Sequence, residues 1–600
     1  MEVKRRTFSR VAEKLAVEAE PGLTTAQLML TNHDLKPVEP ERRQWGPWNF
    51  VAFWDRKKIP DTFNEDSFRG SEERVEQLCQ GVSRVGCRTL SSRHLSPLSS
   101  GAKGTRTDMY QSSSMIVGGL SWWQSWLCVW IGYTIAGFFI CLTGRIGATY
   151  HIGFPVVARS SFGIWGNLWP TFNRAAMACI WYGVQAYIGG HCVYLMIRSI
   201  WLSWDRDKIP NTFGEGSGTS TADFVSFFLF WAGSLPAIWF PVHKIRHLFT
   251  VKAYFVPCAG IAFLIWAVVR AGGVGPIVRQ PARIHGSELA WEFVKGIMSS
   301  IANFATLIVN DPDFARFAVK PRDALWSQFF TIPIGFAVTS FIGIIVSSAS
   351  AIIYNEDPIW DPLNLLERFI DDGGSGQRFG VFVIAAAFTL AQLGTNIAAN
   401  SVSAGTDMTA LLPRYLNIRR GGYICAAVGL AMCPWTLLTD SNQFTLYLSS
   451  YSVFLSSIAG VMISDYYFVR LGYLEVKELY DARKTGPYYF TWGCNWRAYA
   501  AYIAGILINV VGFAGAIGRD VPIGATYIYN VNFFAGFLVS SGVYWLLNKV
   551  SPMPAVSDRW MEVGDEVDDL RVAYNDQSGS QEFDEEQRTY KTAQDDTKVV

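Results

Sequence analysis

The sequence predicts an all-α polytopic membrane protein. Only 17% of its 600 residues are charged, whereas soluble domains carry about 25%. The charged residues gather at the two ends and in short loops, and apolar runs recur between them. Each run is long enough for a helix to cross a hydrocarbon layer of about 30 Å. One run also carries a stripe of amide side chains, which is typical of a binding site inside the membrane.

Eleven apolar segments are predicted to cross the membrane as helices. Several contain Gly or Pro, which membrane helices tolerate because neighbouring groups satisfy the freed backbone. Lys and Arg concentrate in the loops after every second segment, so the positive-inside rule places the C-terminus in the cytosol. The segments are 115–142, 176–201, 224–241, 248–270, 290–309, 325–353, 380–406, 422–439, 442–469, 498–518 and 527–547.

A further span is expected before these eleven, because a cytosolic N-terminus requires an even number of crossings. Residues 45–54 (WGPWNFVAFW) begin like a membrane helix, but the run stops at Asp55. Residues 55–111 are polar, and we interpret them as an atypical insertion that interrupts the first span. The stretch 54–67 matches 204–217 at ten of fourteen positions, so the insertion is either a rearranged coding sequence or a genuine feature.

Three regions follow from this pattern. Residues 1–44 form a polar tail, which we expect in the cytosol, and 45–551 form the transmembrane domain. Residues 552–600 form an acidic tail with few residues able to build a core, so we expect disorder there.

The segment 380–406 (GVFVIAAAFTLAQLGTNIAANSVSAGT) is the most informative. It carries Gln392, Thr395, Asn396 and Asn400, and the three amides are four residues apart. A helix places such residues on one face. Amide groups in a membrane are costly unless they are paired or bind a polar molecule. The stripe therefore predicts a site for a small polar ligand.

Three strings resemble the nucleobase–cation symporters, most closely the fungal branch of uracil, allantoin and uridine permeases. They are WYGVQAYIGG (181–190), NDPDFARF (310–317) and AQLGTNIAANSVSAG (391–405). The resemblance implies twelve spans. Ten of them form a 5+5 inverted-repeat transporter core, and two C-terminal helices follow. It also implies that the first helix of each repeat is broken near the midplane, with the substrate beside the breaks.

The resemblance implies that Trp181 and Gln185 bind substrate from the third span. They are four residues apart, so one helical face presents both. An indole can stack on a flat ring, and a carboxamide can donate and accept hydrogen bonds. Asn400 matches the substrate amide of the eighth span, with Asn396 in support. For all of these residues, packing or a bond to a neighbouring helix is the alternative reading.

In the sixth span, Phe304 matches a position that covers the other face of the substrate ring in some relatives. The alignment can slip by one residue, so Asn303 is the rival, and either side chain could serve packing alone. We treat both as candidate substrate-binding residues.

Ala391, Gly394 and Thr395 stand at the eighth-span positions that hold sodium in sodium-coupled relatives. Gly394 offers no hydroxyl where those relatives tend to carry Ser. Because a hard cation needs several oxygen ligands, we favour a proton over sodium as the coupling ion. Lys252 lies inside an apolar run (LFTVKAYFVP). It is a candidate for proton movement, and snorkelling to the membrane surface is the alternative.

The leading hypothesis is therefore a plasma-membrane symporter with both termini in the cytosol. It would import a nucleobase or related heterocycle such as uracil, allantoin, uridine or a purine. The alternatives are a thiamine or pyridoxine-type permease, and a product that does not transport because its first span is disrupted. An enzyme is not expected, because the spans lack the clusters of acidic, histidine or nucleophilic residues that catalysis needs.

The expected partners are the heterocyclic substrate and the lipid bilayer. The resemblance to fungal permeases also implies ubiquitin-dependent trafficking machinery at the acidic tail, with Lys591 and Lys598 as candidate sites, and an inert solvated tail is the alternative. The Cys and His residues show no ligand spacing, so we expect no cofactor and no metal. We also expect no nucleic-acid partner.

Overall fold

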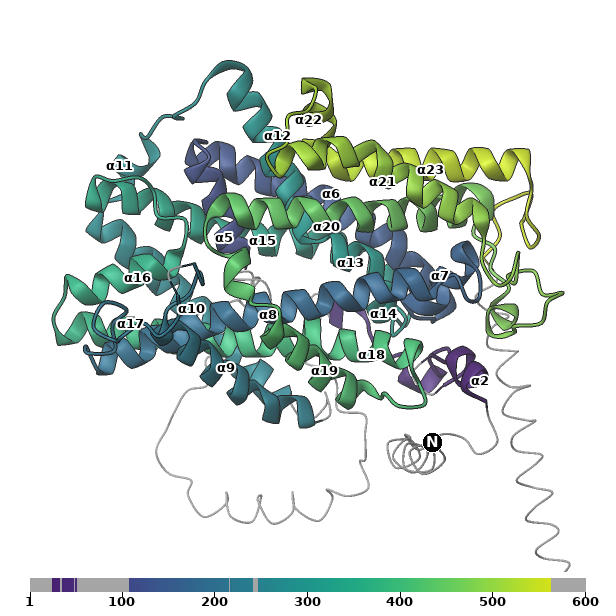
Figure 1. Cartoon of the computed structure of the whole chain (residues 1–600), viewed down its shortest axis with the longest axis horizontal. Helices are drawn as coiled ribbons and strands as arrows, with labels where there is room; N and C mark the ends of the chain where they lie inside the picture. The colour runs from purple at the N-terminus through teal and green to yellow at the C-terminus, as the bar shows by residue number, and fades with distance from the viewer. Residues whose placement is uncertain are drawn as a thin grey trace, which may run out of the picture.

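A computed structural model shows a bundle of helices running side by side along the long axis of the molecule (Figure 1). No β-strand occurs in the part of the chain that the structure describes, and its two β-bridges are isolated pairs. The described residues are 24–32, 35–47, 49–50, 107–214, 216–240 and 246–562.

All eleven predicted spans are helical. Seven long helical stretches in the described ranges are apolar enough to cross a membrane by length and composition. The helices at the predicted spans are α6 (Trp122–Tyr150), α8 (Leu168–Ile200), α9 (Thr221–Trp239), α10 (Arg246–Arg270), α12 (Gly286–Asn303) with α13 (Ala305–Asn310), α15 (Pro321–Tyr354), α17 (Ser375–Thr395) with the π-helix η3 (Asn396–Ser401) and α18 (Val402–Leu411), α19 (Ile418–Ala431), α20 (Ser441–Ser464) with the π-helix η5 (Asp465–Val469), α21 (Trp496–Ala516) and α23 (Asn532–Val550).

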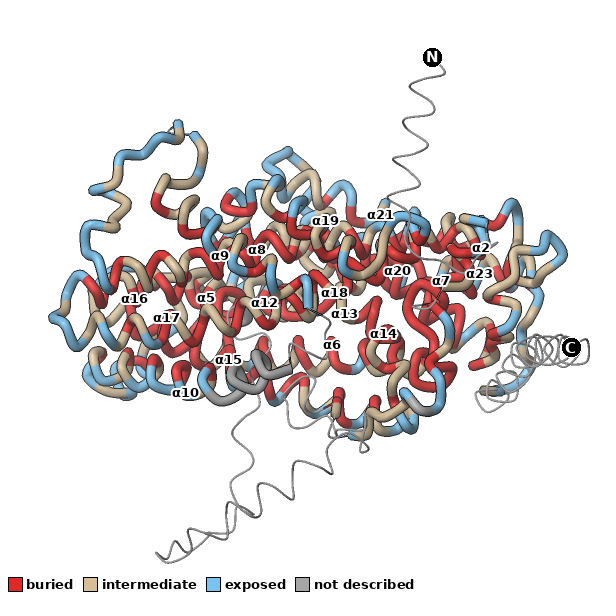
Figure 2. Tube along the Cα trace, turned by 90° about the horizontal axis from the view of Figure 1, so that it is seen from below, coloured by how far each residue is buried: buried red, intermediate tan, exposed pale blue. Residues whose placement is uncertain are grey.

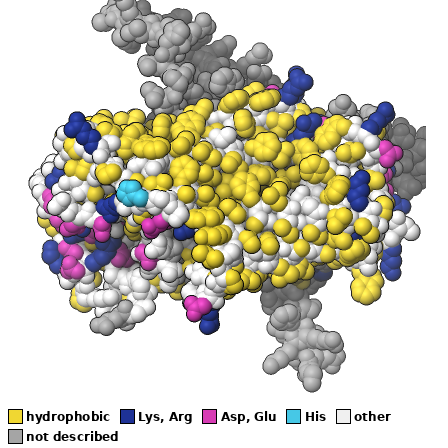
Figure 3. All heavy atoms as spheres, turned by 90° about the horizontal axis from the view of Figure 1, so that it is seen from above, with side chains coloured by type: hydrophobic (Ala, Val, Ile, Leu, Met, Phe, Trp, Pro, Cys, Tyr) yellow, Lys and Arg dark blue, Asp and Glu magenta, His cyan; other side chains and the backbone are white. Residues whose placement is uncertain are grey.

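The surface of the bundle is suited to lipid. Hydrophobic side chains cover a broad belt on the face seen in Figure 3, and the charged side chains lie mostly toward its two ends. Large apolar residues such as Phe138, Phe255 and Leu507 are more than half exposed. Figure 2 shows the buried residues running through the interior of the same bundle. An exposed apolar belt of this extent indicates a membrane environment.

The segment predicted at 115–142 divides into two helices. The first, α5 (Thr107–Val117), ends at a turn in which Gly119 has a φ of +100°, a conformation that glycine adopts without strain. The second, α6, begins after Ser121, where Ser121 and Gln124 form a capping box. The polar insertion expected at 55–111 is thus too long by five residues, since Thr107 to Gln111 belong to α5. Residues 55–106 lie outside the described residues.

Both described flanks of the expected first span pack against the bundle. The Trp45 N–H donates to Phe317 O at 2.9 Å, and Val319 N–H donates to Trp45 O at 2.9 Å. Phe50 is fully buried in a small cluster with Ala148 and other alanines. On the far side of the gap, α5 packs between α15, α12 and α20. The described residues on each side of the expected first span therefore pack against the bundle.

Two further predictions of span boundaries differ from the structure. The segment 422–439 is helical only to Ala431, because Cys433 adopts a left-handed backbone conformation and Pro434 starts a 3₁₀ turn. Several expected loops also contain short helices. These are α7 (Phe154–Phe162), α11 (Val274–Val278), α14 (Pro312–Ala315), α16 (Pro362–Asp371) and α22 (Ile523–Tyr529), and α2 (Thr25–Leu30) lies in the N-terminal tail.

An ion-pair network holds the loops at one end of α8. Glu367 of α16 pairs with Arg198 of α8 and with Arg206, which in turn pairs with Asp223 at 2.8 Å. Burial pushes the pKa of Glu367 upward, but His191 and Arg206 outweigh burial and hold this pKa well below its ordinary value. A lowered carboxylate pKa stabilises the folded state above the unfolded value of about 4.3 and loses that effect at lower pH.

The backbones of α8 and α9 approach closely, and a larger side chain placed between them tests this contact. A Cβ on Gly190 of α8 would lie 2.4 Å from Phe227 Cα of α9, whereas a Cβ on Gly233 would meet nothing within 4 Å. We expect Gly190→Val to lower the free energy of unfolding by about 1–3 kcal/mol, because the two backbones must separate. Thermal unfolding in detergent measures this. Gly233→Val is the control for helix propensity, and equal melting temperatures for the two variants would contradict the packing.

Candidate functional site

The polar stripe of 380–406 lies where the α-helix α17 widens into the π-helix η3. Asn396 and Asn400 both belong to this π-helix and are buried. Asn400 Nδ2 donates to Asn396 Oδ1 at 3.0 Å, and Asn396 Nδ2 donates to the Tyr182 carbonyl of α8 at 3.0 Å. Short π-helical stretches occur frequently at functional sites. The amide nitrogen of Asn396 thus holds the stripe against α8, and its oxygen accepts from Asn400 within the stripe.

Trp181 and Gln185 lie one turn apart on α8, beside the residue that Asn396 contacts. Trp181 is 6% exposed, and its ring meets Tyr447 and Tyr451 of α20 edge-on, at centroid distances of 5.8 and 6.2 Å. Gln185 is 8% exposed. The structure therefore brings an indole, two phenols and a carboxamide together where α8 faces α20.

Several polar groups of this region have no partner among the described residues. The carboxamide of Gln185 forms no hydrogen bond, although its Oε1 is fully buried. The Tyr447 hydroxyl is also buried without a partner. Asn400 uses one N–H to reach Asn396, and its oxygen has no partner among the described residues. A buried unpaired polar group costs about 1–3 kcal/mol, and a polar ligand bound here would pair these groups.

Asn303 and Phe304 lie at a helix break. Phe304 ends α12 and precedes α13, with φ −102° and ψ 0°. Its ring is 2% exposed and packs edge-on against Tyr133 and Phe336, at 5.2 and 4.6 Å between centroids. Asn303 Nδ2 donates to the Tyr133 hydroxyl at 3.0 Å. Both residues are engaged in the protein, in agreement with the packing alternative, and neither contact excludes a ligand on another side.

The break is tied to Trp181 through one tyrosine. Tyr451, which contacts the Trp181 ring, donates its hydroxyl proton to the Ala302 carbonyl at 2.6 Å. Ala302 immediately precedes Asn303 and Phe304. Tyr451 of α20 therefore connects the helix that carries the sixth-span candidates to Trp181 of the third span.

A buried hydrogen-bond chain beside the break was missed from the sequence. The Tyr133 hydroxyl donates to Gln111 Oε1 at 3.2 Å, and Gln111 Nε2 donates to Ser300 Oγ at 3.0 Å. Gln111 is fully buried in α5, within the stretch expected to be an insertion. The signal that could have revealed it is the weakly amphipathic run from Thr107 to Leu120, which the neighbouring charges obscured.

The candidate coupling residues fall in two places. Ala391, Gly394 and Thr395 form the last turn of α17, next to the π-helix, and Ala391 and Gly394 are buried. Lys252 lies on α10, but its side chain is outside the described part of the structure. These positions leave the predicted ion site next to the amide stripe and Lys252 on a separate helix.

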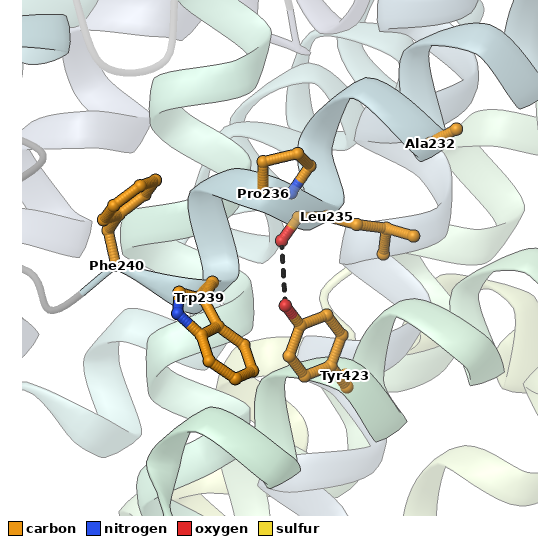
Figure 4. A pocket seen from close by; sticks show the side chains of 6 residues that line it. All are labelled: Ala232, Leu235, Pro236, Trp239, Phe240 and Tyr423. Atoms are coloured by element: carbon orange, nitrogen blue, oxygen red, sulfur yellow. Dashed lines mark hydrogen bonds between the residues drawn. The ribbon is translucent and has the colours of Figure 1, made fainter.

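A groove on the outer surface differs in character from this site. It is lined by apolar residues of α9 and α19, and its one drawn hydrogen bond runs from the Tyr423 hydroxyl to the Leu235 carbonyl at 3.2 Å (Figure 4). Trp239 and Phe240 at its edge are more than half exposed. Such a groove faces the lipid belt and offers little to a polar ligand.

A broken helix, a π-helical turn and unpaired amides thus occur together within a helical bundle of a multi-pass membrane protein. Its family follows from comparison with known proteins. Residues 103–536 match the family model described as permease for cytosine/purines, uracil, thiamine, allantoin. The chain therefore belongs to this family, and its resemblance to the fungal nucleobase–cation symporters is confirmed.

The relatives are similar over most of their length. An uncharacterised permease of Schizosaccharomyces pombe is 48% identical over 91% of this chain and 85% of its own. The allantoin permease of Saccharomyces cerevisiae is 43% identical over 89% of this chain and 78% of its own. The uracil permease of the same yeast is 40% identical over 92% of this chain and 82% of its own.

The solved structure of Mhp1 in its inward-facing conformation shares the fold. It superimposes with a TM-score of 0.65 at 19% identity, over 90% of this chain and 97% of that chain. The predicted all-helical transporter fold is thereby confirmed. The division into two inverted repeats stays a prediction, although the break at Phe304 falls where the second repeat would require one.

The two kinds of amide should respond differently to truncation. Asn396→Ala removes one hydrogen bond from η3 to α8 and one within η3, so we expect the free energy of unfolding to fall by about 1–2 kcal/mol. Gln185→Ala removes an amide that bonds nothing in the protein, so we expect a smaller change. Thermal unfolding of the ligand-free protein in detergent measures both. A greater loss of stability in Gln185→Ala would show that its amide is structural.

Proposed function

We propose that this chain imports a nucleobase or a related heterocycle, such as uracil, allantoin, uridine or a purine, by symport with protons. The unpaired carboxamide of Gln185 beside the Trp181 ring is the observation that carries the proposal. The similarity to permeases named for allantoin and uracil supports the same substrate class.

The geometry suits a flat ring with amide-like edges. The indole of Trp181 offers a face for stacking, and Gln185 can donate to and accept from one N–H/C=O edge of the ring. Asn400 retains one N–H and its oxygen for the same ligand, because Asn396 takes up only its other N–H. Asn396 itself is held by Tyr182, so it positions Asn400 for the substrate.

Proton coupling rests on the absence of a hydroxyl at Gly394 and on the small number of oxygens near the end of α17. Ala391 and Gly394 carry no side-chain oxygen, so Thr395 offers the one hydroxyl of these three positions, and a sodium ion needs several oxygen ligands. Lys252 is a further candidate for the proton pathway, since charged residues in membrane helices are usually functional.

The cellular setting follows from the same family membership. We propose the plasma membrane as the location, with both termini in the cytosol, as the distribution of Lys and Arg indicates. The acidic tail would engage ubiquitin-dependent trafficking machinery through Lys591 or Lys598, both outside the described residues.

A thiamine or pyridoxine-type permease is the alternative substrate class, and the family description includes thiamine. The similarity to permeases named for uracil and allantoin, at 40% and 43% identity, favours the nucleobase class. A product that does not transport is the second alternative. The packing of α5 and of Trp45 against the bundle speaks for a working first span.

Uptake of radiolabelled uracil in a permease-null cell tests the substrate class. Unlabelled allantoin, uridine, a purine or thiamine serves as competitor. We expect one of the nucleobase-like compounds to saturate transport and thiamine to leave it unchanged. Uptake of labelled thiamine alone would assign the alternative class, and no uptake of any of these compounds in labelled form by a surface-expressed protein would indicate the non-transporting product.

The same assay tests the site. We expect Gln185→Ala and Asn400→Ala each to raise the apparent KM by about tenfold or more, because each removes a hydrogen bond within a buried site. Gly233→Val, on the open face of α9, is the control for expression and handling. Unchanged KM values in both amide variants would mean that the substrate binds elsewhere.

A further inference from the structure

Asp311 is a buried carboxyl group that the proposed binding site does not use. It lies at the junction of α13 and α14 (Pro312–Ala315) and is 1% exposed. It follows the break at Phe304 by seven residues, which is about 10 Å along a helix. A single short helix, α13, therefore connects the break at Phe304 to Asp311.

The contacts of Asp311 are few. Gln328 Nε2 of α15 donates to its Oδ2 at 3.1 Å, and its Oδ1 is buried with no partner among the described residues. The neighbouring carboxyl groups have different partners. Asp407 of α18 also has a buried Oδ1 without a partner among the described residues, but its Oδ2 forms an ion pair with Arg174 of α8 at 2.6 Å. Asp313 accepts the backbone N–H of Phe154 at 2.8 Å.

The charged and titratable groups around Asp311 do not neutralise it. Asp313 lies two residues further along α14, and its charge disfavours a second carboxylate beside it. The Cys141 thiol of α6 is the titratable group on the other side. Arg174 is engaged by Asp407 and by the side chain of Asn310 rather than by Asp311. A carboxyl group in this setting is stable in the neutral, protonated form.

Two glycines of α6 lie directly against Asp311 and the residue that follows it. A Cβ on Gly144 would lie 2.1 Å from Asp311 Oδ2, and a Cβ on Gly147 would lie 2.5 Å from Pro312 Cα. The helix backbone thus covers the carboxyl group directly, with no side chain between. Sealing a carboxylate in this way without a cation costs several kcal/mol, whereas sealing a carboxylic acid costs far less.

We propose that Asp311 carries the proton that this transporter moves with its substrate. When the packing of α6 over α13 and α14 opens to water, the carboxylate takes one proton and becomes a neutral acid, which the glycine face can then cover. When the site opens to the other side, the acid releases that proton to water. The proposal rests on proton symport as the proposed function.

The isosteric variant Asp311→Asn mimics the permanently protonated state. Three measurements are made in proteoliposomes or intact cells. The first is counterflow exchange of the labelled substrate. The second is accumulation of substrate against its own concentration gradient, driven by a pH gradient, and the third is substrate-induced alkalinisation of the outside solution. We expect exchange to stay within about twofold of wild type, because it needs no net proton movement. We expect accumulation to collapse to the equilibrium ratio, about tenfold below wild type per pH unit of gradient, with no alkalinisation.

Asp440→Asn is the matched control, since the same substitution at the N-cap of α20 keeps an oxygen acceptor for the Gln443 N–H and lies outside the proposed proton site. We expect it to keep the wild-type ratio of accumulation to exchange. Normal proton movement in Asp311→Asn would overturn the proposal. Equal loss of exchange and accumulation in a surface-expressed Asp311→Asn would overturn it too, because it would indicate a structural role. A wild-type protein that transports without moving protons would overturn proton symport itself, and the wild-type arm alone shows this.

Discussion

The requirement that polar groups inside a membrane bundle be paired organises this structure. No water reaches the hydrocarbon layer, so each amide, hydroxyl or charge in the spans must find a partner in the protein or in a ligand. Most do. Asn396 holds η3 to α8, the chain of Tyr133, Gln111 and Ser300 holds α5 to α6 and α12, and Arg174 holds α8 to α18 through Asp407.

Against this background the buried groups without a partner stand out. They occur in several parts of the described bundle, and two of them, on Gln185 and Tyr447, lie where α8 meets α20. The carboxamide of Gln185, the hydroxyl of Tyr447 and the free oxygen of Asn400 belong to helices that contact one another, close to the π-helix and to the break at Phe304. Backbone departures from regular α-helix in a membrane are tolerated only where the surrounding protein satisfies the freed groups. Their coincidence with unpaired side chains gives the binding site a physical basis that does not depend on the relatives.

The sequence allowed the helices themselves to be predicted well, because a run of about twenty apolar residues has few alternatives to a membrane helix. Every one of the eleven segments is helical. The boundaries were less predictable where a local backbone preference decides them. The turn at Gly119 and the left-handed backbone at Cys433 each interrupt a segment that its hydropathy predicts as one continuous helix. Thr107 to Gln111 were assigned to the polar insertion because hydropathy cannot see that Gln111 is paired with Tyr133 and Ser300.

The residues of the candidate site likewise divide into those that could be predicted from the sequence and those that could not. The stripe of Asn396 and Asn400 could be predicted from spacing, and their bond to each other bears out the shared face. The family resemblance supplied Trp181 and Gln185. The aromatic partners Tyr447 and Tyr451 could not be found, because tyrosines are common in membrane helices and only the fold shows which ones face α8. The distinction between Asn396, whose amide bonds at both ends, and Asn400, whose oxygen has no partner among the described residues, likewise depends on the Tyr182 carbonyl, which no spacing rule identifies.

Glycine placement connects the site to the rest of the bundle. Gly132 of α6 lies against Ser300 of α12, and a Cβ there would come within 2.4 Å of the Ser300 Cβ. Gly144 and Gly147 of the same helix lie equally close to Asp311 and Pro312 at the start of α14, beyond the break at Phe304. Small residues at helix contacts allow backbones to approach closely. The backbones of α6 and of the broken helix are therefore held together on both sides of the break, while Tyr133 of α6 packs against Phe304 itself.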